Sequence, residues 1–127
     1  MQNDYFEDGP IGIQGASDIV GTINKLVQNS AFDLIVWVRD WHPTDHVSFC
    51  QNYSGIKPFS YIESVNGQQM MTWPRHCVQD TVGAMYNSSL ICRPNDKEIL
   101  LGSHKERESI SSFSEEDYQP IGLNEML

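Results

Sequence analysis

The chain has 127 residues, of which 39% are hydrophobic and 20% charged, and its formal net charge is −9. This length suits one domain with its own hydrophobic core, so we expect residues 1–127 to form a single domain. The acidic balance argues against nucleic acid or an anionic membrane surface as a partner.

The first predicted elements are a loop and a helix. Residues 1–15 are expected to form a loop, because glycine and proline interrupt them repeatedly. An amphipathic helix is predicted from Ser17 to about Asn29, with the Ser17 hydroxyl as its cap. The apolar residues that recur at helical spacing on one face are Ile19, Val20, Ile23, Leu26 and Val27.

Two strands are predicted after this helix. The first runs from Phe32 to Arg39, and its unbroken apolar centre suits a strand covered on both faces of a parallel sheet. The second, Glu98 to Leu101, is short and closed by Gly102. A helix followed closely by a buried strand is half of a βαβ unit, which indicates the α/β class. The strand expected before the helix lies outside this sequence, so we expect an incomplete sheet.

The remaining segments have weaker patterns. Residues 43–72 show no strong period, and a loop that folds over a metal site is expected there. Residues 73–90 favour neither helix nor coil. Residues 104–117 are polar and indicate a solvated loop, whereas residues 120–127 look like the first turns of a helix.

The three cysteines, Cys50, Cys77 and Cys92, are an odd number without short paired spacing. A disulfide framework is therefore not expected, and reduced thiols in the cytosol or nucleus are the better interpretation. No apolar run approaches the roughly 20 residues of a membrane helix, and the first residues show no secretory pattern. We therefore expect a cytoplasmic or nuclear protein.

A carboxylate and an imidazole stand at the end of the first predicted strand. Asp40 and His42 are two residues apart, so in an extended chain they point the same way. His76, which follows Trp73 and a proline, offers a second imidazole. Two histidines and one carboxylate with open positions are typical of a catalytic zinc, iron or manganese site. A hydrogen-bonded pair is the alternative for Asp40 and His42.

Three motifs in this order resemble the nicotinamidase (pyrazinamidase) branch of the isochorismatase-like hydrolases. They are residues 1–6 (Met-Gln-Asn-Asp-Tyr-Phe), residues 40–49 (Asp-Trp-His-Pro-Thr-Asp-His-Val-Ser-Phe) and residues 73–78 (Trp-Pro-Arg-His-Cys-Val). The resemblance implies a Rossmann-like parallel sheet with flanking helices, here without its central first strand and its C-terminal strands. It also implies hydrolysis of nicotinamide to nicotinate and ammonia in NAD salvage.

The resemblance further implies roles for particular residues. Asp40, His42 and His76 match the three metal ligands, with zinc as the first choice of metal. His46 matches a position that supplies a ligand in some members and a water-bridged contact in others. The metal would hold the pyridine nitrogen, whereas the residues alone leave a metal-activated water equally open. Tyr5 and Trp73 match walls of the nicotinamide pocket, and plain burial of a loop aromatic is the alternative for each.

The sequence departs from this family at the catalytic groups. Members attack the amide with a cysteine thiolate, assisted by an aspartate and a lysine. Leu101 occupies the lysine position, and the aspartate and cysteine positions lie outside the sequence. Cys77 is not expected to replace the nucleophile. We therefore expect no amidase activity from the chain as written.

Two alternatives stay open. The chain could be a non-catalytic remnant that binds metal and nicotinamide, or a partner of full-length subunits or of a second copy, and Leu101 favours this alternative. It could also be an isochorismatase-like relative with another substrate, which the metal-type motifs around Asp40 and Trp73 disfavour.

Overall fold

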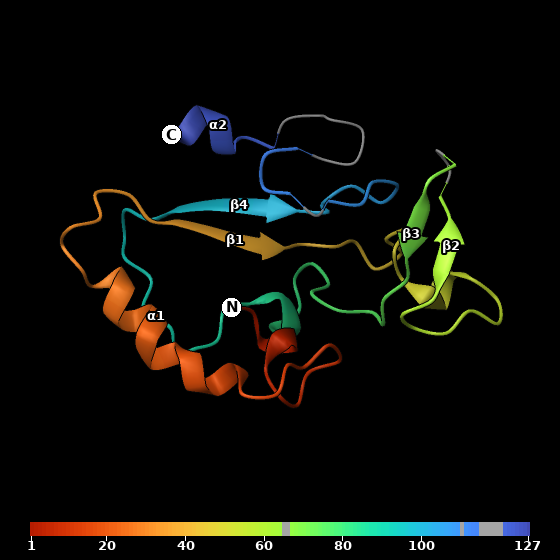
Figure 1. Cartoon of the computed structure of the whole chain (residues 1–127), viewed down its shortest axis with the longest axis horizontal. Helices are drawn as coiled ribbons and strands as arrows, with labels where there is room; N and C mark the ends of the chain where they lie inside the picture. The colour runs from red at the N-terminus through yellow and green to blue at the C-terminus, as the bar shows by residue number, and fades with distance from the viewer. Residues whose placement is uncertain (65–66, 110, 115–120) are drawn as a thin grey trace.

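The computed structural model describes residues 1–64, 67–109, 111–114 and 121–127. A parallel strand pair, a separate antiparallel hairpin and a helix beside the parallel pair make up most of its regular structure (Figure 1). The helices and strands are, in chain order, α1 (Val20–Val27), β1 (Val36–Asp40), β2 (Tyr61–Glu63), β3 (Gln69–Met71), β4 (Lys97–Leu101) and α2 (Leu123–Met126).

The parallel pair consists of β1 and β4, in a register that joins Val36 to Lys97 and Asp40 to Leu101. The second predicted strand is therefore confirmed, with one residue added at its start. The first begins later than predicted, because its ladder starts only at Val36. The prediction that it is covered on both faces is wrong: Val38 is 38% exposed. Among the described residues this sheet has only two strands.

The predicted helix is confirmed only in part. A 3₁₀ turn, Ala16–Ile19, leads into the shorter helix α1, and Ser17 does not cap it. The hydroxyl of Ser17 instead donates a 2.8 Å hydrogen bond to the Glu7 carboxylate. Of the predicted apolar face, Val27 is buried, whereas Leu26 is 51% exposed. The apolar stripe of α1 is thus only partly covered by the described residues.

Residues 43–72 contain regular structure that the sequence did not indicate. Strands β2 and β3 pair in antiparallel fashion, with Tyr61 opposite Met71. Below the hairpin, the fully buried Thr72 donates from its hydroxyl to the carbonyls of Lys57 (3.1 Å) and Ser60 (3.0 Å). These bonds join the end of the hairpin to the loop before it. Residues 43–72 therefore contain a hairpin held against that loop, and not only a loop.

The segment after β1 runs beside residues 73–79, and this pairing builds the functional region. The His42 amide donates to the Cys77 carbonyl (3.0 Å), and the His42 carbonyl accepts from the Gln79 amide (2.8 Å). Further along, Cys50 donates to the Trp73 carbonyl at 2.9 Å. Isolated bridges, His42 with Val78 and Phe49 with Trp73, thereby hold the two stretches side by side.

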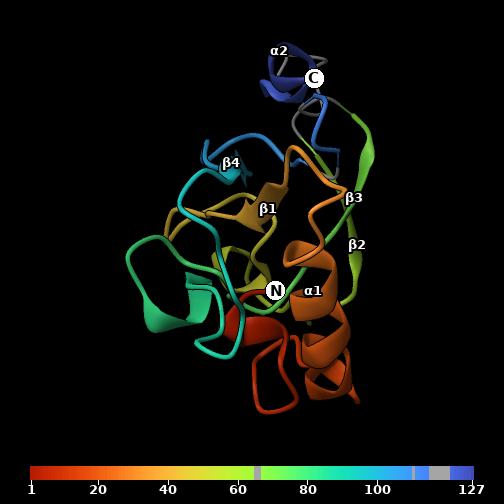
Figure 2. The same ribbon diagram turned by 90° about the vertical axis from the view of Figure 1, so that its left-hand side faces the viewer.

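The remaining predictions concern the ends of the chain. The N-terminal loop contains a 3₁₀ turn, Asn3–Tyr5, which lies beside a second such turn, Val82–Ala84 (Figure 2). The expected C-terminal helix is confirmed as α2. The predicted solvated loop 104–117 is described only in part, because residues 110 and 115–117 lie outside the described residues. No described helix has the length and hydrophobicity needed to cross a membrane.

Candidate metal and ligand site

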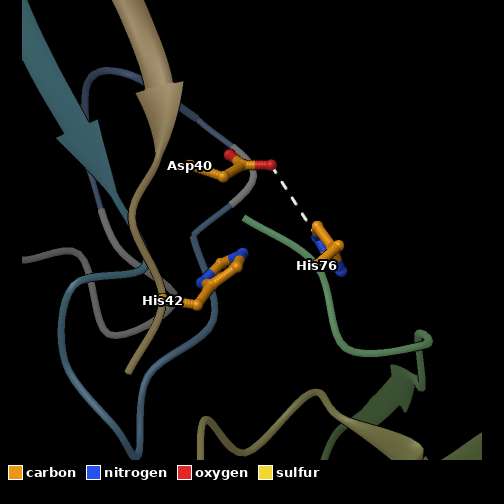
Figure 3. A group of neighbouring side chains, drawn as sticks. All are labelled: Asp40, His42 and His76. Carbon is orange, nitrogen blue, oxygen red and sulfur yellow. Dashed lines mark ion pairs between the residues drawn. The ribbon is translucent and has the colours of Figure 1, made fainter. Parts of the chain in front are cut away.

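Three side chains from two segments converge at the end of β1. Asp40 is the last residue of that strand, His42 follows it, and His76 comes from the neighbouring segment (Figure 3). One potential ligand atom from each lies within 4.8 Å of the other two. His76 Nε2 is 3.9 Å from Asp40 Oδ2, which is too long for a hydrogen bond. Two ligands of one tetrahedral zinc lie about 3.3 Å apart, so this spacing is close to that of a metal site.

Backbone carbonyls select the tautomer of both histidines. Nδ1 of His42 lies 3.0 Å from the Gly102 carbonyl oxygen, and Nδ1 of His76 lies 2.7 Å from that of Pro74. A carbonyl only accepts, so each Nδ1 carries the proton and each Nε2 keeps a free lone pair. This is the outer-shell arrangement that orients histidine ligands in metal sites. The donor set therefore fits a divalent metal such as zinc.

Gly102 is required for this arrangement. Its φ of +58° lies in the left-handed region, and a Cβ there would stand 2.4 Å from Cε1 of His42. A glycine at the end of β4 thus lets the backbone approach the imidazole closely enough for its carbonyl to accept from Nδ1. The glycine that closes the predicted strand has a role in the site that its position alone did not indicate.

Burial favours the neutral form of two of the histidines, His42 and His46. His42 is 3% exposed and His46 is fully buried. Loss of hydration, together with the neighbouring His46, lowers the pKa of His42 to about 3. Burial also lowers the pKa of His46. A neutral imidazole is the form that binds a metal, so the site favours the metal-binding state at neutral pH.

We expect the metal-free protein to lose stability as the pH falls from 7 to 5.5. His42 titrates near 6.5 in the unfolded chain but near 3 in the folded one, so the unfolded state binds more protons below pH 6.5. The free energy of unfolding should therefore fall by about 1 kcal/mol, before most carboxylates titrate. Urea unfolding at both pH values measures this. The control is His104→Ala, which replaces an exposed histidine and should show the same decrease in the free energy of unfolding. A free energy of unfolding that is equal at pH 7 and pH 5.5 would contradict the expectation.

Phe49 packs at the centre of the site. The sequence analysis named it only as the last residue of the motif 40–49 and gave it no role. It is fully buried, and its ring centroid lies 5.5 Å from those of His42 and His76 and 5.7 Å from that of His46. The contacts are edge-to-face, the geometry that aromatic rings prefer. Phe49 therefore forms the apolar floor against which all three imidazoles pack.

Tyr5 and Trp73, the two expected ring walls, both flank His76. Their ring centroids lie 6.3 Å and 6.4 Å from the His76 imidazole, in each case edge-to-face. Both are half-buried, which leaves surface for a ligand. Phe59 packs edge-on against Trp73 at 5.7 Å, an aromatic neighbour that sequence reasoning missed. The Tyr5 hydroxyl also donates to Oδ2 of Asp40.

Comparison with known proteins decides the family. No family model matches the chain. A nicotinamidase of Acinetobacter baylyi is 38% identical over 117 residues, which cover 92% of this chain and 53% of that protein. The structure of an Acinetobacter baumannii nicotinamidase/pyrazinamidase superposes with a TM-score of 0.90 and 34% identity, over 98% of this chain and 59% of that one. The chain belongs to the nicotinamidase family.

Two further solved members carry a ligand. Yeast nicotinamidase Pnc1p bound to the inhibitor nicotinaldehyde matches with a TM-score of 0.90 and 27% identity, over 100% of this chain and 65% of that one. The pyrazinamidase of Pyrococcus horikoshii in complex with zinc matches with a TM-score of 0.66 and 27% identity, over 86% of this chain and 51% of that one. The predicted isochorismatase-like α/β fold is thereby confirmed. The chain spans between 51% and 65% of the length of these four relatives.

The resemblance leaves open whether His46 is a ligand. Its Nε2 lies 2.9 Å from the Arg107 carbonyl, and its Nδ1 lies 2.8 Å from the Ser48 hydroxyl. Both nitrogens therefore have partners. Its ring packs on that of His42, with centroids 4.3 Å apart. In the described structure His46 packs on His42 and lies outside the three-residue cluster.

Leu101, where the resemblance implies a lysine, is an apolar residue of β4. Leu101 is buried, at 8% exposed, and is the register partner of Asp40. A lysine that follows in the sequence, Lys105, is exposed and pairs with Asp45 at 2.8 Å. Cys77 is fully buried, and burial raises the pKa of its thiol, as do the Asp40 and Asp4 carboxylates. A thiol of this kind stays protonated at neutral pH, which makes it a poor nucleophile.

Proposed function

We propose that this chain forms the metal- and nicotinamide-binding part of a site for the hydrolysis of nicotinamide to nicotinate and ammonia, a step in NAD salvage. The observation that carries the proposal is the convergence of the Asp40 carboxylate with the free Nε2 atoms of His42 and His76. Support also comes from relatives named nicotinamidase and from the nicotinaldehyde bound to yeast Pnc1p.

In this proposal Asp40, His42 and His76 hold a divalent metal, zinc before iron or manganese. The bound metal would supply a Lewis-acid centre, suited to holding a pyridine nitrogen or to lowering the pKa of a water. Trp73 and Tyr5, whose rings both lie edge-to-face with His76, would line the space for a flat heteroaromatic ring. The zinc found in the Pyrococcus horikoshii pyrazinamidase supports the choice of metal.

A second candidate function is binding without hydrolysis, and Leu101 favours it. A thiolate nucleophile needs a positive charge or base close by. The register partner of Asp40 on β4 is the buried, uncharged Leu101. The chain would then be a metal-dependent nicotinamide binder, or a partner of full-length subunits or of a second copy. We place either form in the cytosol or nucleus.

We expect the purified 127-residue chain, loaded with zinc, to bind nicotinamide without releasing ammonia. Titration calorimetry measures the binding, and a coupled ammonia assay measures turnover. The heat should disappear in a His42→Ala variant, which lacks one proposed ligand, and persist in His104→Ala. Ammonia release above the His42→Ala background would favour the enzyme over the binder. If the folded, zinc-loaded protein gave no heat of nicotinamide binding, both candidate functions would be wrong.

A further inference from the structure

The N-terminal turn of residues 2–5 touches both segments that carry the proposed metal ligands. Its side chains Gln2, Asp4 and Tyr5 each make a hydrogen bond to one of these segments. Such contacts join parts of the chain that are between 35 and 73 residues apart in sequence. The turn is therefore placed to fix the distance between the two ligand segments.

Gln2 holds the main chain of Asp40. Its side chain is 3% exposed, and its amide nitrogen donates to the Asp40 carbonyl at 2.5 Å. Its amide oxygen accepts from the Asp40 N–H at 2.8 Å. A carboxamide carries the same donor and acceptor as a peptide, so Gln2 pairs with Asp40 as a neighbouring strand would. The peptide of Asp40 is thus fixed at the edge of β1.

Asp4 holds the segment of the second histidine. Its Oδ2 accepts from the Cys77 N–H at 2.7 Å. Cys77 has a φ of +46°, in the left-handed region that residues other than glycine rarely adopt. Room for this carboxylate comes from Gly83, where a Cβ would stand 2.3 Å from both Asp4 carboxylate oxygens. The bond from Asp4 thus supports a strained turn immediately after His76.

Tyr5 holds the side chain of Asp40. Its hydroxyl donates to Oδ2, which is also the oxygen that lies 3.9 Å from His76 Nε2. A carboxylate oxygen has two lone pairs, so this bond orients the group and leaves a lone pair for a metal. The hydroxyl is therefore an outer-shell contact, distinct from the ring surface that would face a ligand.

We propose that Gln2, Asp4 and Tyr5 form a positioning clamp that sets the Asp40 carboxylate and the His76 imidazole at metal-binding distance. The proposal rests on the proposed metal site. None of the three residues is a metal ligand or a catalytic residue in it. The clamp acts by holding the two ligand segments before metal arrives, which reduces the ordering that binding must impose.

Cobalt(II) binding to the full chain tests the clamp, because the visible absorption of bound cobalt reports both affinity and ligand geometry. Tyr5→Phe keeps the aromatic ring and removes only the hydroxyl. We expect it to weaken cobalt binding about 10- to 100-fold, the usual effect of losing an outer-shell partner. The thermal unfolding of the metal-free variant should stay close to that of the parent. The matched control is Tyr53→Phe, which also loses only a hydroxyl, one that donates at 2.8 Å to the Val47 carbonyl and not to a proposed ligand.

Amide hydrogen exchange on the metal-free protein gives a second readout. Asp4→Ala should expose the Cys77 amide to faster exchange, whereas Asp4→Asn, which keeps an acceptor, should restore its protection and the cobalt affinity. If the parent binds cobalt and Tyr5→Phe binds it equally well, the clamp is wrong and the metal site stands. If the parent binds no cobalt, the proposed metal site is wrong and the clamp's role falls with it. Unchanged Cys77 exchange in Asp4→Ala also overturns the clamp.

Discussion

Replacement of His42 by alanine is expected to weaken zinc or cobalt binding by more than about 100-fold. Loss of an outer-shell partner alone costs about 10- to 100-fold, and this substitution removes a proposed ligand itself. His42 is also the histidine with the most complete support, since Gly102 orients its Nδ1 and His46 packs on its ring. Competition with a chromophoric chelator measures the dissociation constant.

The control for this substitution is His104→Ala, which removes an exposed histidine outside the three-residue cluster. It should bind metal as the parent does. Because His42 is buried, the variant's metal-free fold has to be verified by circular dichroism and thermal unfolding. A folded His42→Ala protein with parental affinity would show that the three-residue cluster is not the metal site.

The parallel strand pair could be predicted because its signal is local. Five consecutive apolar residues, from Leu34 to Val38, indicate a buried strand wherever they occur. The bounds of β1 could not be predicted, because they depend on where Lys97 and Leu101 pair with it. The hairpin gave no signal, since β2 and β3 have three residues each and alternate weakly. Its position depends on the buried Thr72, whose bonds form only in the folded chain.

The site was predictable to the extent that motifs carry it. The spacing of Asp40 and His42 already placed them on one side of an extended chain, and His76 was the second imidazole that the sequence offered. The family resemblance then matched all three to metal ligands. The structure brings all three together, and their role as ligands stays a prediction. The supporting contacts of Gln2 and Tyr5 could not be predicted, because they join residues 38 and 35 positions apart in sequence. Nothing local in the sequence distinguishes such residues from loop residues.

The residues that hold the site come from several parts of the fold, and Phe49 packs against all three imidazoles. Replacement of Phe49 by alanine is expected to lower the free energy of unfolding by about 3–5 kcal/mol, as for other fully buried aromatic residues. The same substitution removes the surface against which three imidazoles pack. Metal affinity should therefore fall together with stability. Urea unfolding with and without zinc measures both effects.

The matched control is Phe113→Ala. Because Phe113 is 48% exposed, this substitution should lower the free energy of unfolding by less than about 1 kcal/mol. Phe49→Leu restores most of the apolar volume but not the flat ring. It should recover much of the stability while leaving metal binding weak, because aliphatic branches do not offer the imidazoles an aromatic edge. If Phe49→Leu recovered both fully, Phe49 would act through volume alone, and the ring contacts would not position the histidines.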